Sequence, residues 1–226
     1  MRKNPSTLNG VGVVEIADHY ERLLRQLPKP PVIMGHSFGG LVVQMLLDRG
    51  LGAAGVAIDS APPKGILSLP WSVLKSSSPV LRNPANLRRT VALSFEQFCY
   101  GFANVMPEDE ARAAYERYAI PGPGRPIFQA AFANLNPWAA TRVEYRAADR
   151  APLLLIAGGA DHQVPASLNR TNYRNYAKSP AVTAFKEFPG RSHLLIAQRG
   201  WEEVADYALD WVGRQLPLNQ HQEVES

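Results

Sequence analysis

The sequence has very little cysteine and no long apolar run, and each scarcity excludes a class of protein. A single cysteine, Cys99, among 226 residues excludes an internal disulfide framework and a cysteine-rich zinc site. The most apolar segment, residues 151–160, is far too short to cross a bilayer. Residues 1–6 lead into polar and glycine residues, so no secretory signal is expected. We therefore expect a cytoplasmic protein with no membrane partner.

A strong excess of charge is also missing. The chain has 24 Lys and Arg against 20 Asp and Glu, a formal net charge of +4. The cations are scattered and form no block, so nothing specific indicates a nucleic-acid partner. What is present is an ordinary globular composition with 46% hydrophobic residues. At this length we expect one large domain or one domain with an insertion, able to bury its core without a disulfide or metal.

Apolar periodicity divides the chain into strands and helices. A helix is predicted over residues 14–27, ended by the prolines at 28, 30 and 31. Further helices are predicted over residues 41–47 and 166–176 and near the C-terminus. Short apolar runs predict buried strands over residues 32–34, 55–58, 153–157 and 181–188. This alternation predicts an α/β fold with a mostly parallel sheet.

Residues 64–150 have a different sequence pattern. The strand–helix alternation stops, and the pattern predicts several helices broken by prolines. More than half of the chain's 20 aromatic residues lie in this segment. Two interpretations stay open for them. The rings could simply pack the segment onto the rest of the protein, or some of them could line an apolar substrate cleft.

The segment Gly35–Gly39 (GHSFG) fits the G-x-S-x-G pattern between a predicted strand and a predicted helix. In that context Ser37 sits in a tight, strained turn that projects its hydroxyl from the end of the strand. Small residues two before and two after the serine prevent clashes across the turn. The start of the helix places backbone N–H groups beside the serine. We therefore predict that Ser37 is a nucleophile.

A serine hydroxyl needs a base and a group that orients that base. His193 follows the last predicted strand, in a loop that can reach the carboxyl edge of the sheet. Asp161 follows the preceding strand at the same edge, and the order Ser37, Asp161, His193 is the order expected for this architecture. Asp59, after the second strand, is the competing acid. The aspartate that is not used is expected to cap or shape its loop.

These motifs together resemble the α/β-hydrolase superfamily, in its branch of lidded serine esterases, lipases and cofactor-free haloperoxidase-like enzymes. Gly35–Gly40 (GHSFGG) looks like the nucleophile elbow, Gly158–Pro165 (GGADHQVP) like the acid turn, and Gly190–His193 (GRSH) like the histidine loop. The resemblance covers essentially the whole chain. It implies an α/β-hydrolase core formed by residues 1–63 and 151–226, with residues 64–150 as a helical lid.

The resemblance also implies roles for the residues. Ser37 would attack an acyl carbonyl, His193 would move its proton, and Asp161 would orient and stabilise the imidazole. The Phe38 N–H would be one oxyanion donor, and no metal or organic cofactor would be required. Aspartate at the elbow would indicate a haloalkane dehalogenase or epoxide hydrolase, and Ser37 argues against both.

The sequence departs from the family ahead of the elbow. Only 34 residues precede Gly35, so the usual first strands and the loop that gives a second oxyanion N–H have no counterpart. A lid amide, Ser60 or a neighbouring chain could replace that donor. The strand at 32–34 would have an open edge, which predicts a homo-oligomer or poor solubility. A start assigned too late in the gene, or deliberate shortening, would explain the departure equally well.

Three functions fit these observations. The first is a serine hydrolase of small, fairly apolar carboxylic esters, acting through an acyl-enzyme and weakened by the missing donor. The second is a hydrolase-fold protein without catalysis that binds a small ligand beneath the lid. The third is a perhydrolase or haloperoxidase-like activity that uses the same three residues. The substrate's identity does not follow from the fold.

Overall fold

Four parallel strands form the central sheet of the computed structural model, which describes residues 4–216. They are β1 (Val32–His36), β2 (Ala54–Ile58), β5 (Leu153–Gly158) and β6 (Thr183–Phe188), paired in the order β1-β2-β5-β6. Helix α2 (Phe38–Asp48) joins β1 to β2, and α7 (Ala166–Tyr176) joins β5 to β6. The predicted parallel α/β sheet is confirmed. All four strands carry their carboxyl ends to the same edge.

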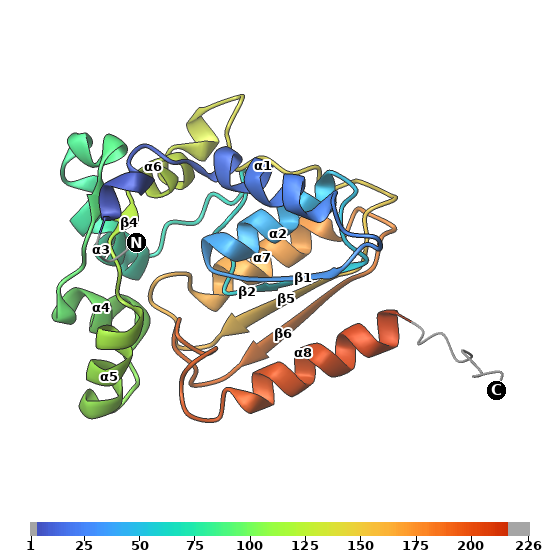
Figure 1. Ribbon diagram of the computed structural model, residues 1–226. Helices are drawn as coiled ribbons and strands as arrows, with labels where there is room; N and C mark the ends of the chain where they lie inside the picture. The colour runs from blue at the N-terminus through green and yellow to red at the C-terminus, as the bar shows by residue number, and fades with distance from the viewer. Residues whose placement is uncertain (1–3, 217–226) are drawn as a thin grey trace.

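Helices cover both faces of this sheet. Helix α1 (Val13–Leu24) lies with α2 and α7 on one face, and α8 (Glu202–Gln215) covers the other (Figure 1). Along β5, Leu153 and Leu155 join the core beneath α1 and α2, whereas Leu154 and Ile156 join the core beneath α8. All four are fully buried, and each contributes about 1.5–3 kcal/mol of transfer free energy. Burial on both faces explains why the strand is continuously apolar.

The helices of residues 64–150 lie beyond the carboxyl ends of the strands, and the end of this segment runs back to the start of β5 (Figure 1). As expected, the segment is mainly helical: α3 (Trp71–Leu81), α4 (Phe95–Phe102), α5 (Glu108–Tyr118) and α6 (Arg125–Ala131). The 3₁₀ turns η2 (Pro84–Arg88) and η3 (Ala133–Leu135) and a two-residue antiparallel pair, β3 (Thr90–Val91) with β4 (Gly122–Pro123), complete the segment. A further 3₁₀ turn, η1 (Pro5–Leu8), precedes α1. Periodicity did not predict the β3–β4 pair, because two residues are too few to show it.

Strand β1 is at the edge of the described sheet and pairs only with β2. The predicted open edge is therefore present, whereas the oligomer expected from it stays a prediction. The first helix ends at Leu24, three residues earlier than predicted. Its predicted apolar stripe stays half exposed, with Tyr20 at 49% and Leu23 at 46%. The described sheet has no strand beyond β1 on which this stripe could pack. Within residues 4–216, every helix falls short of the length and apolarity that crossing a membrane requires.

Candidate active site

Ser37 occupies a strained turn between β1 and α2. Its backbone has φ 56° and ψ −122°, a conformation that costs a non-glycine residue about 1–3 kcal/mol. Two hydrogen bonds hold the turn. The Ser37 N–H donates to the Ile58 carbonyl at 2.9 Å, and the Gly40 N–H donates to the Ser37 carbonyl at 2.9 Å. The turn is thus fixed both to the neighbouring strand and to the helix that follows.

The glycines around Ser37 have unequal roles. A Cβ at Gly35 would lie 2.3 Å from the Gly39 carbonyl oxygen, so a side chain there is excluded. A Cβ at Gly39 would meet nothing within 4 Å. The expectation that both flanking positions must be small holds for Gly35 and is wrong for Gly39. The second tight position is Gly40, where a Cβ would lie 2.9 Å from Cβ of Ser60.

The first N–H of α2 belongs to Phe38, the predicted oxyanion donor. Within residues 4–216 no hydrogen bond uses this N–H, whereas the Gly40 and Leu41 N–H groups donate to the Ser37 carbonyl. An unused N–H at a helix start is suited to an anionic oxygen. Ser60, one suggested replacement for the second donor, is buried and donates its hydroxyl to the Ala61 carbonyl at 3.0 Å. Ser60 is therefore not available for that role.

Asp161 and His193 meet at the carboxyl edge of the sheet, as their places after β5 and β6 predict. Nδ1 of His193 lies 2.6 Å from Oδ2 of Asp161. The other Asp161 oxygen accepts the N–H groups of Gln163 at 2.6 Å and Val164 at 2.8 Å. Both Asp161 and His193 are buried. This arrangement fixes the ring and directs Nδ1 to the carboxylate, which leaves Nε2 for proton transfer.

Asp59, the competing acid, belongs to the same buried cluster. It has φ 42° and is fully buried. Its Oδ1 accepts the Gly158 N–H at 2.7 Å, while Oδ2 has no donor within reach and lies 4.0 Å from Nδ1 of His193. Burial, and then the negative charge of Asp161, raise the pKa of Asp59 well above its usual range. A raised pKa disfavours the charged form of Asp59, and Asp161, which accepts two backbone N–H groups, is the better partner for His193.

The structure does not join Ser37 to His193 by a hydrogen bond. Nε2 of His193 is buried and has no hydrogen-bond partner among residues 4–216. Phe102 of α4 packs edge-on against the imidazole at 5.0 Å between centroids. The Leu194 N–H also donates to the Phe102 carbonyl at 3.0 Å. Catalytic contacts are often long in unliganded enzymes, and here α4 lies over the ring that would make the contact.

Sequence reasoning missed the position of His36. Its ring packs on that of His193, with 4.6 Å between the ring centroids. The His36 Nε2–H donates to the His193 backbone carbonyl at 2.6 Å. Burial, together with the charge of His193, lowers the pKa of His36 to about 3. His36 is thus a neutral group that connects the elbow to the histidine loop.

One group in the described chain has the spacing of metal ligands, namely His36, Asp59 and His193, whose ligand atoms lie within 4.8 Å of one another. Each of these side chains already has a hydrogen-bond partner: the His193 carbonyl, the Gly158 N–H and the Asp161 carboxylate, respectively. These contacts use one atom of each side chain, and they leave Oδ2 of Asp59 and Nε2 of His193 without a hydrogen-bond partner among residues 4–216.

Ser37 opens into a cavity of about 190 Å³ between the sheet edge and residues 64–150. Most of its wall is aliphatic, and the lining includes Ile66, Leu67, Leu69, Val73, Leu74, Leu81, Ile127, Ala130, Val164 and Leu168. The insertion's aromatic residues do not line it. Phe95, Phe98 and Tyr115 pack on one another instead, with ring centroids 5.5–5.6 Å apart. The packing interpretation therefore holds for these three rings and not for the largely exposed Trp71 and Trp138, and the cleft interpretation is wrong for this cavity.

Comparison with known proteins agrees with this architecture. A model of the alpha/beta hydrolase family matches residues 4–207, nearly the whole chain. The chain belongs to the alpha/beta hydrolase family. No curated protein matches this family member by sequence at a significant level. The family assignment therefore rests on the match to the family model and on the fold.

Solved structures show how far this alpha/beta hydrolase resembles others. The monoacylglycerol lipase of Paleococcus ferrophilus is 19% identical, with a TM-score of 0.62 over 92% of this chain and 77% of that one. Tomato methylketone synthase I, complexed with 2-tridecanone, is 12% identical, with a TM-score of 0.64 over 91% and 80%. An esterase of Thermogutta terrifontis is 16% identical, with a TM-score of 0.58 over 90% and 73%. At these identities the likeness establishes the fold. The uncovered remainder of each structure agrees with a sheet that is shortened here.

Proposed function

We propose that this alpha/beta hydrolase is a serine esterase that cleaves small, apolar carboxylic esters through an acyl-enzyme on Ser37. One observation carries the proposal: a strained serine opens into an aliphatic cavity, and a buried Asp161–His193 pair lies at the same sheet edge. Strain of this kind persists only where the surroundings enforce it, and it concentrates at functional sites.

The proposed reaction has two half-reactions, and both use the same three residues. Oγ of Ser37 attacks the ester carbonyl carbon, and Nε2 of His193 takes the hydroxyl proton. The C–O bond to the alcohol then breaks, and His193 returns the proton to the leaving oxygen. Water attacks the acyl-enzyme by the same route and releases the acid and the free serine. Asp161 stays ionised throughout and stabilises the imidazolium.

This reaction requires Nε2 of His193 to reach Oγ of Ser37. The two atoms are not hydrogen-bonded in the structure, so the contact would form when substrate binds. The Phe38 N–H supplies one oxyanion donor. Gln163 also lines the cavity, and its side-chain amide is a candidate for the second donor. With one donor alone, turnover would fall by about 10²–10³-fold.

The cavity's size and chemistry suggest the substrate class. A volume of about 190 Å³ suits a short acyl or alcohol chain, and the aliphatic wall favours an apolar one. Two structural relatives agree with this preference, since one is named a monoacylglycerol lipase and the other is complexed with 2-tridecanone.

Fluorophosphonate labelling, run beside turnover of p-nitrophenyl butyrate, tests the proposal. The wild type should be labelled and active, and Ser37→Ala should lose both properties while keeping the circular dichroism spectrum of the folded protein. Turnover at the wild-type rate in Ser37→Ala would remove this residue from the nucleophile role.

A second candidate function is ligand binding without catalysis. The unpartnered Nε2 of His193 favours it, because a histidine that never reaches the serine cannot activate it. In that case the folded wild type would resist the fluorophosphonate but would still bind a short-chain ester without cleaving it. A dependence of turnover on peroxide and carboxylate would instead indicate the perhydrolase alternative.

A further inference from the structure

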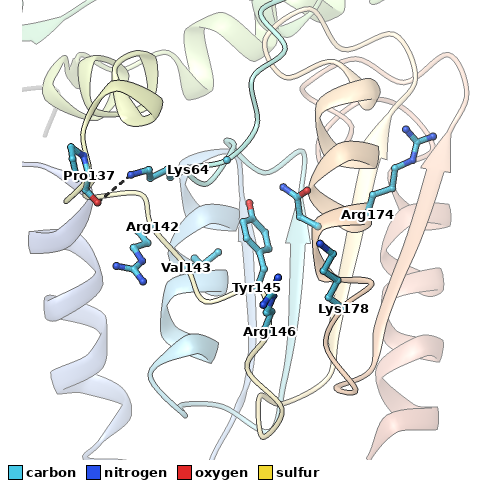
Figure 2. A pocket seen from close by; sticks show the side chains of 10 residues that line it. Lys64, Pro137, Arg142, Val143, Tyr145, Arg146, Arg174 and Lys178 are labelled. Carbon is cyan, nitrogen blue, oxygen red and sulfur yellow. Dashed lines mark hydrogen bonds between the residues drawn. The ribbon is translucent and has the colours of Figure 1, made fainter.

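A second cavity, separate from that of Ser37, lies beside the loop that leads from residue 137 to residue 146. Its volume is about 490 Å³, and Figure 2 shows the side chains that line it. Its lining is Lys64, Gly65, Pro137, Arg142, Val143, Tyr145, Arg146, Arg174, Asn175 and Lys178. The two cavities share no residue, although Gly65 lines this one and the next residue, Ile66, lines the other. We call the second cavity the basic pocket.

Positive charge dominates the basic pocket. Five of its ten lining residues are Lys or Arg, and none is acidic. The ion pairs among residues 4–216 include none of the five. The Lys64 ammonium donates to the carbonyls of Asn136 at 2.7 Å and Pro137 at 3.1 Å, which fixes its position without neutralising it. The pocket therefore gathers like charges that no carboxylate offsets directly.

The surroundings of the basic pocket do little to reduce this charge. Two acids lie near the pocket: Asp48, which accepts the Glu144 N–H at 3.1 Å, and Glu144, whose carboxylate accepts the Arg146 N–H at 2.9 Å. Burial raises the pKa of Asp48, and Arg142 opposes that rise only weakly. Beneath the pocket, Arg150 is buried over the ring of Tyr176 and makes no ion pair. These groups leave the local balance strongly positive.

Tyr145 gives the basic pocket an aromatic wall. Its ring packs edge-on against Tyr176 at 4.8 Å between centroids. Its hydroxyl is buried beside the Asn175 side chain but makes no hydrogen bond within 3.5 Å. In Figure 2 the ring stands between Val143 and Lys178, with Lys64 above it and Arg146 below. A ligand with both an apolar part and anionic groups would satisfy this arrangement.

We propose that the basic pocket binds a soluble organic phosphate that carries at least two negative charges. Three arginines favour phosphate because the guanidinium fork matches two of its oxygens. The number of cations indicates more than one negative charge, and Tyr145 would contact the organic portion. The volume is in the range of small-molecule sites. The pocket is open and four of its five cations are exposed, so a soluble ligand can reach them directly.

Calorimetric titration with inorganic pyrophosphate at low ionic strength tests this proposal. The wild type should bind saturably, and added salt should weaken the binding. The triple variant Arg142→Gln, Arg146→Gln, Lys178→Gln should bind at least ~30-fold more weakly, because it loses several charge-assisted hydrogen bonds. A matched control, Arg82→Gln, Arg88→Gln, Arg89→Gln, removes the same charge from exposed positions around η2 and should bind within about twofold of the wild type.

Three outcomes would overturn the proposal. The wild type might show no saturable binding up to millimolar pyrophosphate, or the control triple might lose as much affinity as the pocket triple. Alternatively, the wild type might bind only vesicles that contain phosphatidic acid, with no competition from pyrophosphate, which would make a lipid headgroup the ligand. Both triple variants should keep the circular dichroism spectrum and the urea unfolding midpoint of the wild type, and this verifies that each is folded.

Discussion

Two loops at the carboxyl edge of the sheet carry buried aspartates that differ in their hydrogen-bond donors. Asp161, after β5, accepts hydrogen bonds from two backbone N–H groups and from His193. Asp59, after β2, accepts one, from Gly158. Both are buried at the ends of parallel strands, so burial alone does not distinguish them. The difference lies in the number of donors aimed at each carboxyl group, because each such donor favours the charged form.

The two carboxyl groups also influence each other. Two negative charges this close in a dry site cannot both be stable, so the less solvated group keeps its proton. The raised pKa of Asp59, caused by burial and then by Asp161, identifies Asp59 as that group. Oδ2 of Asp59 accepts no hydrogen bond from another residue among residues 4–216. When it carries a proton, it can donate to the Asp161 carboxylate. Asp59 is thus a positioning residue for the proposed triad.

The largest expected effect comes from Asp161→Asn. The Asn oxygen would take the place of Oδ1, because the Gln163 and Val164 N–H groups require an acceptor there. The amide NH₂ would then face Nδ1 of His193 and force the wrong tautomer. We expect a fall in kcat of about 10³–10⁴-fold, measured with p-nitrophenyl butyrate. A loss smaller than tenfold would mean that Asp161 is not the triad acid.

The next prediction tests whether Asp59 can replace Asp161 as the carboxyl group that supports His193. In Asp161→Ala one cause of the raised pKa of Asp59 is gone, while burial, the larger cause, remains. Because Oδ2 of Asp59 lies only 4.0 Å from Nδ1 of His193, Asp59 should then partly support the imidazole. Adding Asp59→Asn to Asp161→Ala should lower kcat by a further ~10-fold, the effect of one charged hydrogen bond. Equal rates in the single and double variants would show that Asp59 gives no such support.

The sequence predicted the local parts of this site well. The G-x-S-x-G pattern located the turn at Ser37, and the strand ends located Asp161 and His193, because parallel strands bring their carboxyl ends to one edge. Apolar runs predicted all four strands of the central sheet. These features depend on neighbours in the chain or on the repeating geometry of the sheet, so periodicity and motif spacing capture them.

Features that depend on distant contacts were not predictable. Nothing local to His36 shows that its ring packs on His193, 157 residues away. The neutral state of Asp59 depends on Asp161, which belongs to another strand. The tight position at Gly40 depends on Ser60 in a neighbouring loop, and the exposed stripe of α1 depends on which strands the sheet contains. Each of these requires the assembled fold.

The pH dependence of stability separates the two aspartates in a different way. Because the pKa of Asp59 is raised in the folded state, the folded protein holds a proton that the unfolded chain releases above about pH 4. Stability from this group therefore falls as pH rises, by up to about 1.4 kcal/mol per unit, until the folded pKa is reached. Asp59→Asn removes this slope.

Urea unfolding of the wild type and Asp59→Asn between pH 4 and pH 8 measures this difference. All other titrating groups are common to both proteins, so the difference between their free energies of unfolding isolates Asp59. The variant should gain stability relative to the wild type as pH rises. A difference that is constant with pH would show that Asp59 is ionised in the folded protein.

The smallest expected effect is that of Asp59→Asn on activity, and it completes the comparison with Asp161→Asn. The Asn oxygen would keep the acceptor that the Gly158 N–H requires. The NH₂ group would then donate toward Asp161, as the protonated carboxyl group does. Asp-to-Asn substitution should thus disable the site at position 161 but be tolerated at position 59. We expect kcat of Asp59→Asn to stay within about threefold of the wild type, because one neutral hydrogen bond replaces another. Asp59→Ala, which supplies no donor, should lower kcat more than Asp59→Asn does. If Asn and Ala at position 59 lower kcat equally, the hydrogen bond to Asp161 has no role in catalysis and Asp59 serves only to fix its loop.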